Sequence, residues 1–135
     1  MKHRTSFTND IKVPKSTYPE DWSKSEAIIT KEHVLYCHEH QIDFWHTKVK
    51  GEPHMGKNGL PFTKKAANSG FFDMIFLFDN SVTFFLELKK GGTGGIWAGH
   101  QVEQYNKVIR RGGFALCSNS VKLTHTYLLS KGLVK

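Results

Sequence analysis

The chain is poor in cysteine, proline and long apolar runs, and each shortage excludes a class of protein. Its 135 residues include 2 cysteines and 4 prolines, too few for a disulfide-stapled secreted domain or a proline-rich disordered tail. We interpret Cys37 and Cys117 as small buried hydrophobic residues in a reducing compartment. The longest uninterrupted apolar run, Met74–Phe78, is far shorter than the roughly 20 residues that a membrane-spanning helix needs.

The N-terminus lacks the mark of an exported protein. Basic residues stand in Met1–Ser6, but no apolar stretch follows them, so this is not the pattern of a secretory signal. We therefore expect a cytoplasmic protein, in a bacterial or phage-infected cell, with no membrane partner.

Acidic residues are outnumbered by basic ones. The chain has 19 Lys and Arg residues against 12 Asp and Glu residues, a formal net charge of +7, which favours an anionic partner without identifying the anion. Hydrophobic residues make up 39% and aromatic residues 13% of the sequence. That is enough apolar surface to offset chain entropy in a single packed domain.

The chain divides into an extended N-terminal arm, residues 1–22, and one domain, residues 23–135. The arm mixes Lys, Thr, Pro and Asp without periodicity. The domain opens with a helix, for which Ser23 is the predicted N-cap and Glu26 stands three residues on, as in a capping box. The predicted apolar face of this helix consists of Ile28, Ile29, Leu35 and Tyr36.

Strands and helices then alternate along the domain. Apolar periodicity and turn residues predict strands over 42–49, 71–78, 82–88 and 114–117, and helices over 98–111 and 121–129. A stretch rich in Gly, Pro and Lys, residues 51–70, is predicted to be a long basic loop. The resulting order αβββαβα predicts an α/β fold with a central mixed sheet flanked by helices. The two apolar runs on either side of residue 80 form a hairpin expected at the centre of that sheet.

Two acidic residues interrupt this apolar hairpin. If residues 79–81 form a three-residue loop, Asp73 directly faces Glu87, with Cβ atoms roughly 4.5–5.5 Å apart, whereas a two-residue loop places them on opposite faces. Lys89 lies on the same face as Glu87 because side chains alternate along a strand. Two carboxylates and one ammonium suit a hard cation such as Mg²⁺ or Mn²⁺ beside a phosphate. The alternative is an ion pair between Lys89 and one of the two acids.

Three short motifs follow one another along the chain. One predicted strand carries Gly-x-x-Asp, the next carries Glu-x-Lys, and the following helix opens with glutamine: Gly70, Asp73, Glu87, Lys89 and Gln101. This pattern resembles the VRR-NUC (virus-type replication-repair nuclease) family of the PD-(D/E)XK nuclease superfamily. The resemblance covers about residues 23–130 and implies a restriction-endonuclease-like core, whose order is also αβββαβα. Phe72 stands where the family often has proline.

The resemblance implies a role for each matching residue of the hairpin. It implies that Asp73 and Glu87 bind Mg²⁺ or Mn²⁺, with the backbone carbonyl of Leu88 as a third ligand. Lys89 corresponds to the catalytic lysine.

Two further residues, on the helices, have roles implied by the resemblance and purely structural alternatives. Glu26 is an expected catalytic residue and a further candidate metal ligand, but capping by Ser23 would explain it equally well. Gln101 is expected to support catalysis, and its alternative is a satisfied buried amide. Gln104 is the rival of Gln101 if the linker before the helix has another register.

The resemblance implies a metal-dependent DNA endonuclease. Structure-selective cleavage of branched, junction or flap DNA in replication, repair or recombination and a homodimer are further expectations. Lys57, Lys64 and Lys65 of the basic loop, together with Lys90, are expected to contact DNA phosphates; the alternative for the loop lysines is a solvated loop. The alternative function is a non-catalytic basic module that binds nucleic acid through its phosphates.

Overall fold

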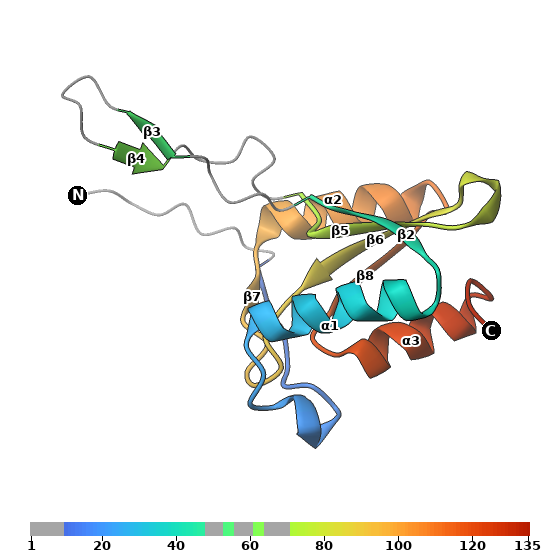
Figure 1. The fold of residues 1–135 in the computed structure, drawn as a ribbon, viewed down its shortest axis with the longest axis horizontal. Helices are drawn as coiled ribbons and strands as arrows, with labels where there is room; N and C mark the ends of the chain where they lie inside the picture. The colour runs from blue at the N-terminus through green and yellow to red at the C-terminus, as the bar shows by residue number, and fades with distance from the viewer. Residues whose placement is uncertain (1–9, 48–52, 56–60, 64–70) are drawn as a thin grey trace.

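The computed structural model describes residues 10–47, 53–55, 61–63 and 71–135. Its centre is a mixed four-stranded sheet in the order β2-β5-β6-β8, with α-helices on both faces (Figure 1). The strands are β2 (Asp43–His46), β5 (Met74–Leu77), β6 (Thr83–Leu88) and β8 (Phe114–Ser118). The helices are α1 (Glu26–Glu39), α2 (Gly99–Arg110) and α3 (Val121–Ser130).

The predicted α/β class and the order αβββαβα are confirmed for these elements. Strands β5 and β6 form the central hairpin, antiparallel to each other, and β8 runs parallel to β6 at the edge of the sheet. Among the described helices, none is both long enough and apolar enough to cross a lipid bilayer.

Short elements that the sequence pattern did not predict add to this core. Strand β1 (Ile11–Lys12) pairs with β7 (Ile96–Trp97), and β3 (Pro53–Met55) pairs with β4 (Pro61–Thr63). A 3-10 turn, η1 (Pro19–Asp21), precedes α1. The prediction of one long basic loop over 51–70 is therefore wrong in part, because the β3–β4 ribbon lies within it. Strands of two or three residues are too short to carry a periodic signal.

One face of the sheet forms the hydrophobic core beneath α1 and α3. Alternate residues of the central strands point to this face and are fully buried: Met74, Phe76, Phe84, Leu86 and Leu88. They pack against Ile29, Tyr36 and Cys37 of α1 and Leu128 of α3. Ile28 and Leu35, predicted on the apolar face of α1, are instead exposed. The buried stripe of that helix follows the spacing i, i+4, i+7, i+8 from Ile29, which leaves both residues outside it.

The start of α1 differs from the predicted capping box. Ser25, not Ser23, is the N-cap, because its backbone is extended and its hydroxyl accepts a hydrogen bond from the N–H of Ile28 at 3.3 Å. Glu26 is then the first residue of the helix and cannot be the capping partner of Ser23. The explanation of Glu26 as the capping partner of Ser23 is therefore wrong.

The predicted hairpin register is confirmed. The turn η2 (Asp79–Ser81) supplies a three-residue loop that the N–H of Phe78 closes by donating to the carbonyl of Val82 at 2.7 Å. Asn80 has a φ of 60°, a left-handed conformation that asparagine tolerates better than most residues. Cross-strand pairs from Leu77↔Thr83 to Met74↔Leu86 have the register expected for this loop length.

The described part of the predicted arm, residues 10–22, lies against the domain. The N–H of Ser16 donates to the carbonyl of Gly91 at 3.0 Å, and the N–H of Val13 donates to that of Gly95 at 2.9 Å. A Cβ added at Gly91 would stand 1.9 Å from the carbonyl oxygen of Asp21. Glycine is therefore required where this segment crosses the linker between β6 and α2.

Candidate functional site

The acidic residues of the hairpin lie at one end of the central sheet, where β5 begins and β6 ends at its arrowhead (Figure 1). Asp73 immediately precedes β5 and is 3% exposed, and Glu87 of β6 is 1% exposed. Lys89 follows β6, with a largely buried side chain. Two acids and one lysine thus share a buried end of the sheet. The predicted direct pairing of Asp73 with Glu87 is wrong, however, because the regular ladder ends at Met74↔Leu86.

Gln101 connects two of these side chains. Its Nε2 donates to Oε2 of Glu87 at 2.6 Å, and its Oε1 accepts from Nζ of Lys89 at 3.3 Å. Nζ of Lys89 also lies 3.2 Å from Oε2 of Glu87. The three side chains therefore form a closed cluster, and Gln101, not its rival Gln104, makes these contacts.

The N-terminus of α2 holds Gln101 in this position. Gln101 is the third residue of the helix, and its Oε1 also accepts from the N–H of Ala98, the N-cap, at 3.0 Å. Ala98 has no side-chain acceptor to offer the helix. The missing cap comes from Asp10, whose Oδ1 accepts from the N–H of Gly99 at 2.5 Å. No local sequence signal links Asp10 to a helix so far along the chain.

Asp73 sits at an irregularity of the sheet. The regular ladder ends at Met74↔Leu86, and the N–H of Asp73 donates to the carbonyl of Leu86 at 2.9 Å. Asp73 and Met74 therefore lie opposite one residue, the arrangement of a β-bulge. The Asp73 side chain lies beside this irregularity, and its Oδ2 accepts a hydrogen bond from the N–H of Leu88 at 2.8 Å.

The carbonyl of Leu88 points to the same side as its N–H. Both groups of one strand residue are directed to the same neighbouring strand, and the N–H of Leu88 is bound by the carboxylate of Asp73. The predicted third ligand therefore points toward the side of the sheet where Asp73 lies.

Thr47, which directly follows β2, fixes the backbone around Asp73. Its N–H donates to the carbonyl of Asp73 at 2.9 Å, and its hydroxyl donates to the carbonyl of Phe72. The sequence analysis missed Thr47, because a single threonine after a strand carries no signal of a distant partner.

Glu26 belongs to the same electrostatic neighbourhood. Cys117 faces Glu87 in the parallel pairing of β6 with β8. Burial raises the pKa of the Cys117 thiol to about 12, and the negative charges of Glu87, Asp73 and Glu26 act in the same direction, while Lys89 opposes them. All four charged side chains therefore act on one thiol. Cys117 is only partly buried, so the prediction of two buried cysteines holds for Cys37 alone.

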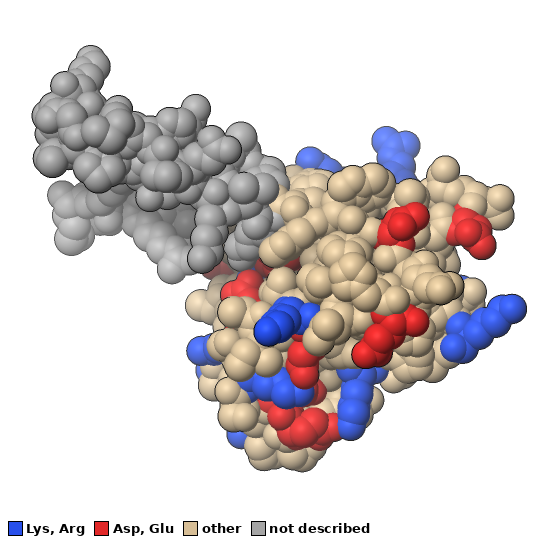
Figure 2. All heavy atoms as spheres, in the orientation of Figure 1, with Lys and Arg blue, Asp and Glu red and all other residues tan. Residues whose placement is uncertain are grey.

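The residues expected to contact DNA are only partly described. Lys90 is exposed, directly after Lys89, whereas Lys57, Lys64 and Lys65 lie outside the described residues. On the face shown in Figure 2, basic and acidic side chains are interspersed, so no patch of one sign covers that face.

In its chemistry, the predicted donor set is of the kind that a magnesium-type ion accepts. Among the described side chains, no three of His, Cys, Asp or Glu converge so that they could hold a metal. The predicted set has only two carboxylates, from Asp73 and Glu87, together with the Leu88 carbonyl. Mg²⁺ is commonly bound by one or two carboxylates and keeps several of its waters, so a third acidic side chain is not needed.

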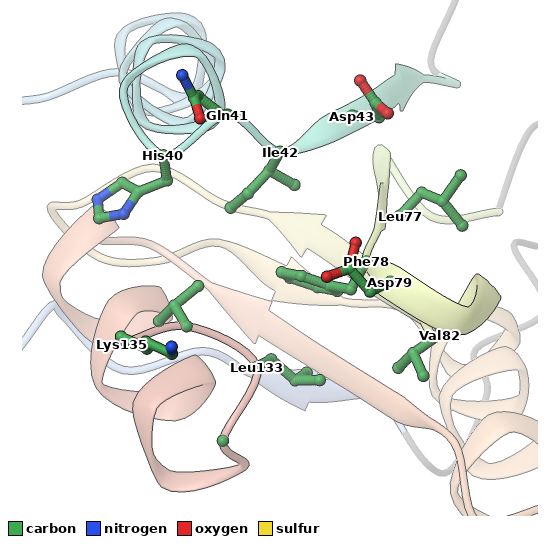
Figure 3. Close-up of a pocket in the computed structure, with 12 residues that line it drawn as sticks. His40, Gln41, Ile42, Asp43, Leu77, Phe78, Asp79, Val82, Leu133 and Lys135 are labelled. Atoms are coloured by element: carbon green, nitrogen blue, oxygen red, sulfur yellow. The ribbon is translucent and has the colours of Figure 1, made fainter.

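A separate cavity of about 600 Å³ lies at the opposite end of the hairpin (Figure 3). Its lining comes from the turn before β2, the β5–β6 loop and the C-terminal residues 132–135. Ile42, Phe78 and Leu133 contribute apolar walls, and Asp43 and Asp79 contribute carboxylates. None of the site residues predicted from the sequence lines this cavity.

Comparisons of the chain with protein-family models, with curated proteins and with solved structures gave no match.

Proposed function

We propose that this chain is a metal-dependent DNA endonuclease with a restriction-endonuclease-like core. The observation that carries the proposal is the contact of Glu87 and Lys89 with each other and with Gln101, next to the buried carboxylate of Asp73. These four residues come from three parts of the chain, the start of β5, the end of β6 and helix α2, and each matches a position of the nuclease pattern.

The residues divide the work of phosphodiester hydrolysis. Asp73, Glu87 and the carbonyl of Leu88 would hold Mg²⁺ or Mn²⁺, which when bound lowers the pKa of a water and neutralises charge on the phosphate. Lys89, 3.2 Å from Glu87, donates to the negative oxygens that develop as the water attacks phosphorus. Gln101 keeps Lys89 and Glu87 at a fixed separation, so the two groups need not be oriented, at an entropy cost, in the transition state.

The basic segment between β2 and β5 supports a DNA substrate. Residues 48–70 hold 5 of the 19 Lys and Arg residues and only 1 of the 12 Asp and Glu residues. This segment begins directly after Thr47 and ends two positions before Phe72. The hydroxyl of Thr47 donates to the carbonyl of Phe72, and the N–H of Thr47 donates to the carbonyl of Asp73. Lysines in this part of the sequence would bring DNA phosphates toward the site. Selectivity for branched, junction or flap DNA, the homodimer and the cytoplasmic location remain predictions.

A cleavage assay tests the proposal. Linear, flapped and four-way DNA are incubated with the parent chain in Mg²⁺ or Mn²⁺, and with the variants Glu87→Gln and Lys89→Ala. We expect cleavage by the parent chain and a loss of about 100-fold or more in rate for each variant, the scale measured for removal of one electrostatic group from an active site.

Two exposed residues of α2 provide matched controls, Glu103→Gln and Lys107→Ala. Both are expected to cut at the rate of the parent chain. Equal cleavage by Lys89→Ala and the parent chain would show that the nuclease assignment is wrong.

The second candidate function is a basic module that binds nucleic acid without cutting it. The ion pair of Glu87 with Lys89 favours it, because a lysine that neutralises the acid leaves less need for a metal. Calorimetry separates the two functions: the module predicts no heat of Mn²⁺ binding and a DNA affinity that falls steeply with salt, whereas the nuclease predicts Mn²⁺ binding that Glu87→Gln abolishes.

A further inference from the structure

The sheet face opposite the core carries a row of large apolar side chains. The register places Trp45 beside Ile75, and Ile75 beside Phe85. Residues directly opposite each other on neighbouring strands point to the same face. Glu87 is two residues beyond Phe85 on β6 and shares this face because side chains alternate along a strand.

This row is rich in aromatic rings and is partly open to solvent. Trp45 is 55% exposed and Phe71 is 38% exposed. The ring of Phe85 lies 6.2 Å from that of Phe71 and 5.3 Å from that of Phe72, centroid to centroid. We call Trp45, Phe71, Ile75 and Phe85 the aromatic surface.

Helix α2 lies over the β8 side of this face, and its Gln101 reaches Glu87 at the end of β6. It packs against β8, where Ala115, the neighbour of Phe85 in the register, is buried. Trp45 lies on the edge strand β2, away from β8. The aromatic surface therefore runs from the edge of the sheet to the candidate site.

We propose that the aromatic surface stacks unpaired bases of the DNA strand whose phosphate lies at Glu87 and Lys89. The proposal rests on the proposed function for its substrate and adds the surface that receives the bases. Aromatic rings on a sheet face stack bases of any sequence, because every base has a π-face. Phe85 is about 7 Å from Glu87 along the strand, so a base next to a phosphate at the site reaches this ring.

Charge favours this occupant over a second copy of the chain. Two copies meeting on the aromatic surface would bring together chains that each carry a net charge of +7, whereas a nucleic acid strand offsets that charge. The lysine-rich residues 48–70 stand in the sequence between Trp45 and Phe71. Phosphate binding and ring stacking are thus supplied by adjoining parts of the chain.

Binding without cleavage tests the proposal. The affinity of the parent chain for a single-stranded oligothymidylate is measured by fluorescence anisotropy in EDTA, next to an abasic oligonucleotide with the same number of phosphates. Trp45→Leu keeps apolar area but removes the ring, and should weaken binding of the base-bearing strand by about tenfold, the equivalent of one lost base stack. Binding of the abasic strand should not change. Trp45→Phe keeps a ring and should retain most of the affinity.

Trp22→Leu is the matched control, since Trp22 is 44% exposed and lies on the N-terminal segment. It should bind both oligonucleotides like the parent chain. Equal affinity of Trp45→Leu and the parent for the base-bearing strand overturns the proposal, as does an equal loss for both strands. A parent dimer that dissociates on Trp45→Leu in sedimentation also overturns it, because the surface would then be covered by a second copy. If the parent chain never cleaves DNA but Trp45→Leu still weakens binding of the base-bearing strand alone, the nuclease proposal is wrong and the stacking proposal stands.

Discussion

Single side chains at the candidate site are held by partners from other elements. Glu87 of β6 is bound by Gln101 of α2, and Asp73 is bound by the backbone N–H of Leu88 across the hairpin. Removing one partner takes a hydrogen bond from a buried polar group, and a net protein hydrogen bond is typically worth about 0.5–1.5 kcal/mol. The same side chains therefore contribute to folding and to the proposed chemistry.

The buried side chain of His33 hydrogen-bonds to two helices. It is fully buried on α1, and its Nδ1 donates to the carbonyl of Ile29 at 2.8 Å. Because a neutral ring has one N–H, Nε2 accepts from the hydroxyl of Thr124 on α3 at 2.7 Å. Thr124 is itself hydrogen-bonded to Ser118 of β8 at 2.8 Å. The neutral ring thus ties α1 to α3 and, through Thr124, to the sheet.

The free energy of unfolding should fall as the pH is lowered from about 6.5 to about 4. Burial lowers the pKa of His33 from 6.5 to about 4, so between these values the unfolded chain binds a proton that the folded chain does not. The stabilisation is complete above pH 6.5 and is lost toward pH 4, by about 3 kcal/mol for this shift. Urea unfolding at a series of pH values measures it.

His38 provides the control for this pH dependence. It is exposed on the same helix, so His38→Gln should keep the slope of stability against pH. A slope that is the same in His33→Gln as in the parent chain would assign the pH dependence to other groups.

At the scale of elements, α2 depends on a residue from the N-terminal segment. Its own N-cap, Ala98, makes no side-chain hydrogen bond, and the carboxylate of Asp10 binds the N–H of Gly99 instead. The pairing of β1 with β7 brings the two segments together. A negative charge at this end of the helix also interacts favourably with the helix dipole.

Asp10→Ala should destabilise the protein by about 1 kcal/mol, the usual cost of losing a helix cap. Asp10→Asn should restore most of the loss, because asparagine caps helices as well as aspartate does. Thermal unfolding of the two variants and the parent chain measures both effects. Equal melting temperatures for Asp10→Ala and the parent chain would show that this contact does not stabilise α2.

At the scale of the whole molecule, the described N-terminal residues complete the domain. The side-chain amide of Asn119, after β8, donates to the carbonyl of Pro14 at 2.9 Å. The glycines of the β6–α2 linker let residues 10–22 approach closely, most tightly at Gly91. The segment therefore spans the linker that leads from Lys89 to Gln101.

Gly91→Ala should displace this segment, because the added Cβ would lie 1.9 Å from the carbonyl oxygen of Asp21. We expect a lower free energy of unfolding and faster tryptic cleavage at Lys12 and Lys15. Gly112→Ala is the comparison: its added Cβ meets nothing within 4 Å, and only its φ of +75° opposes the substitution, at about 1–2 kcal/mol.

Gly91→Ala should be the more destabilising of the two and should alone expose the segment to trypsin. If the two variants unfold at the same urea concentration and Lys12 and Lys15 stay protected in both, the contact at Gly91 does not hold the segment.

The sequence by itself determined the order of the main elements and the register of the central hairpin. A period of 3.6 or 2 residues and the three-residue loop at Asp79–Ser81 are local properties, and they were sufficient to bring Asp73 and Glu87 to the same end of the sheet. The helix cap was predicted two residues early, because Ser23 and Ser25 are equally good caps by type and only the backbone conformation separates them.

Only the tertiary structure decided how the site is assembled. The bulge at Asp73, the contact of Gln101 with Glu87 and the capping of Gly99 by Asp10 join residues far apart in the chain. Such contacts depend on how elements pack against one another, which leaves no periodic trace in the sequence. Local periodicity therefore specifies which side chains share a face, and packing specifies which of them touch.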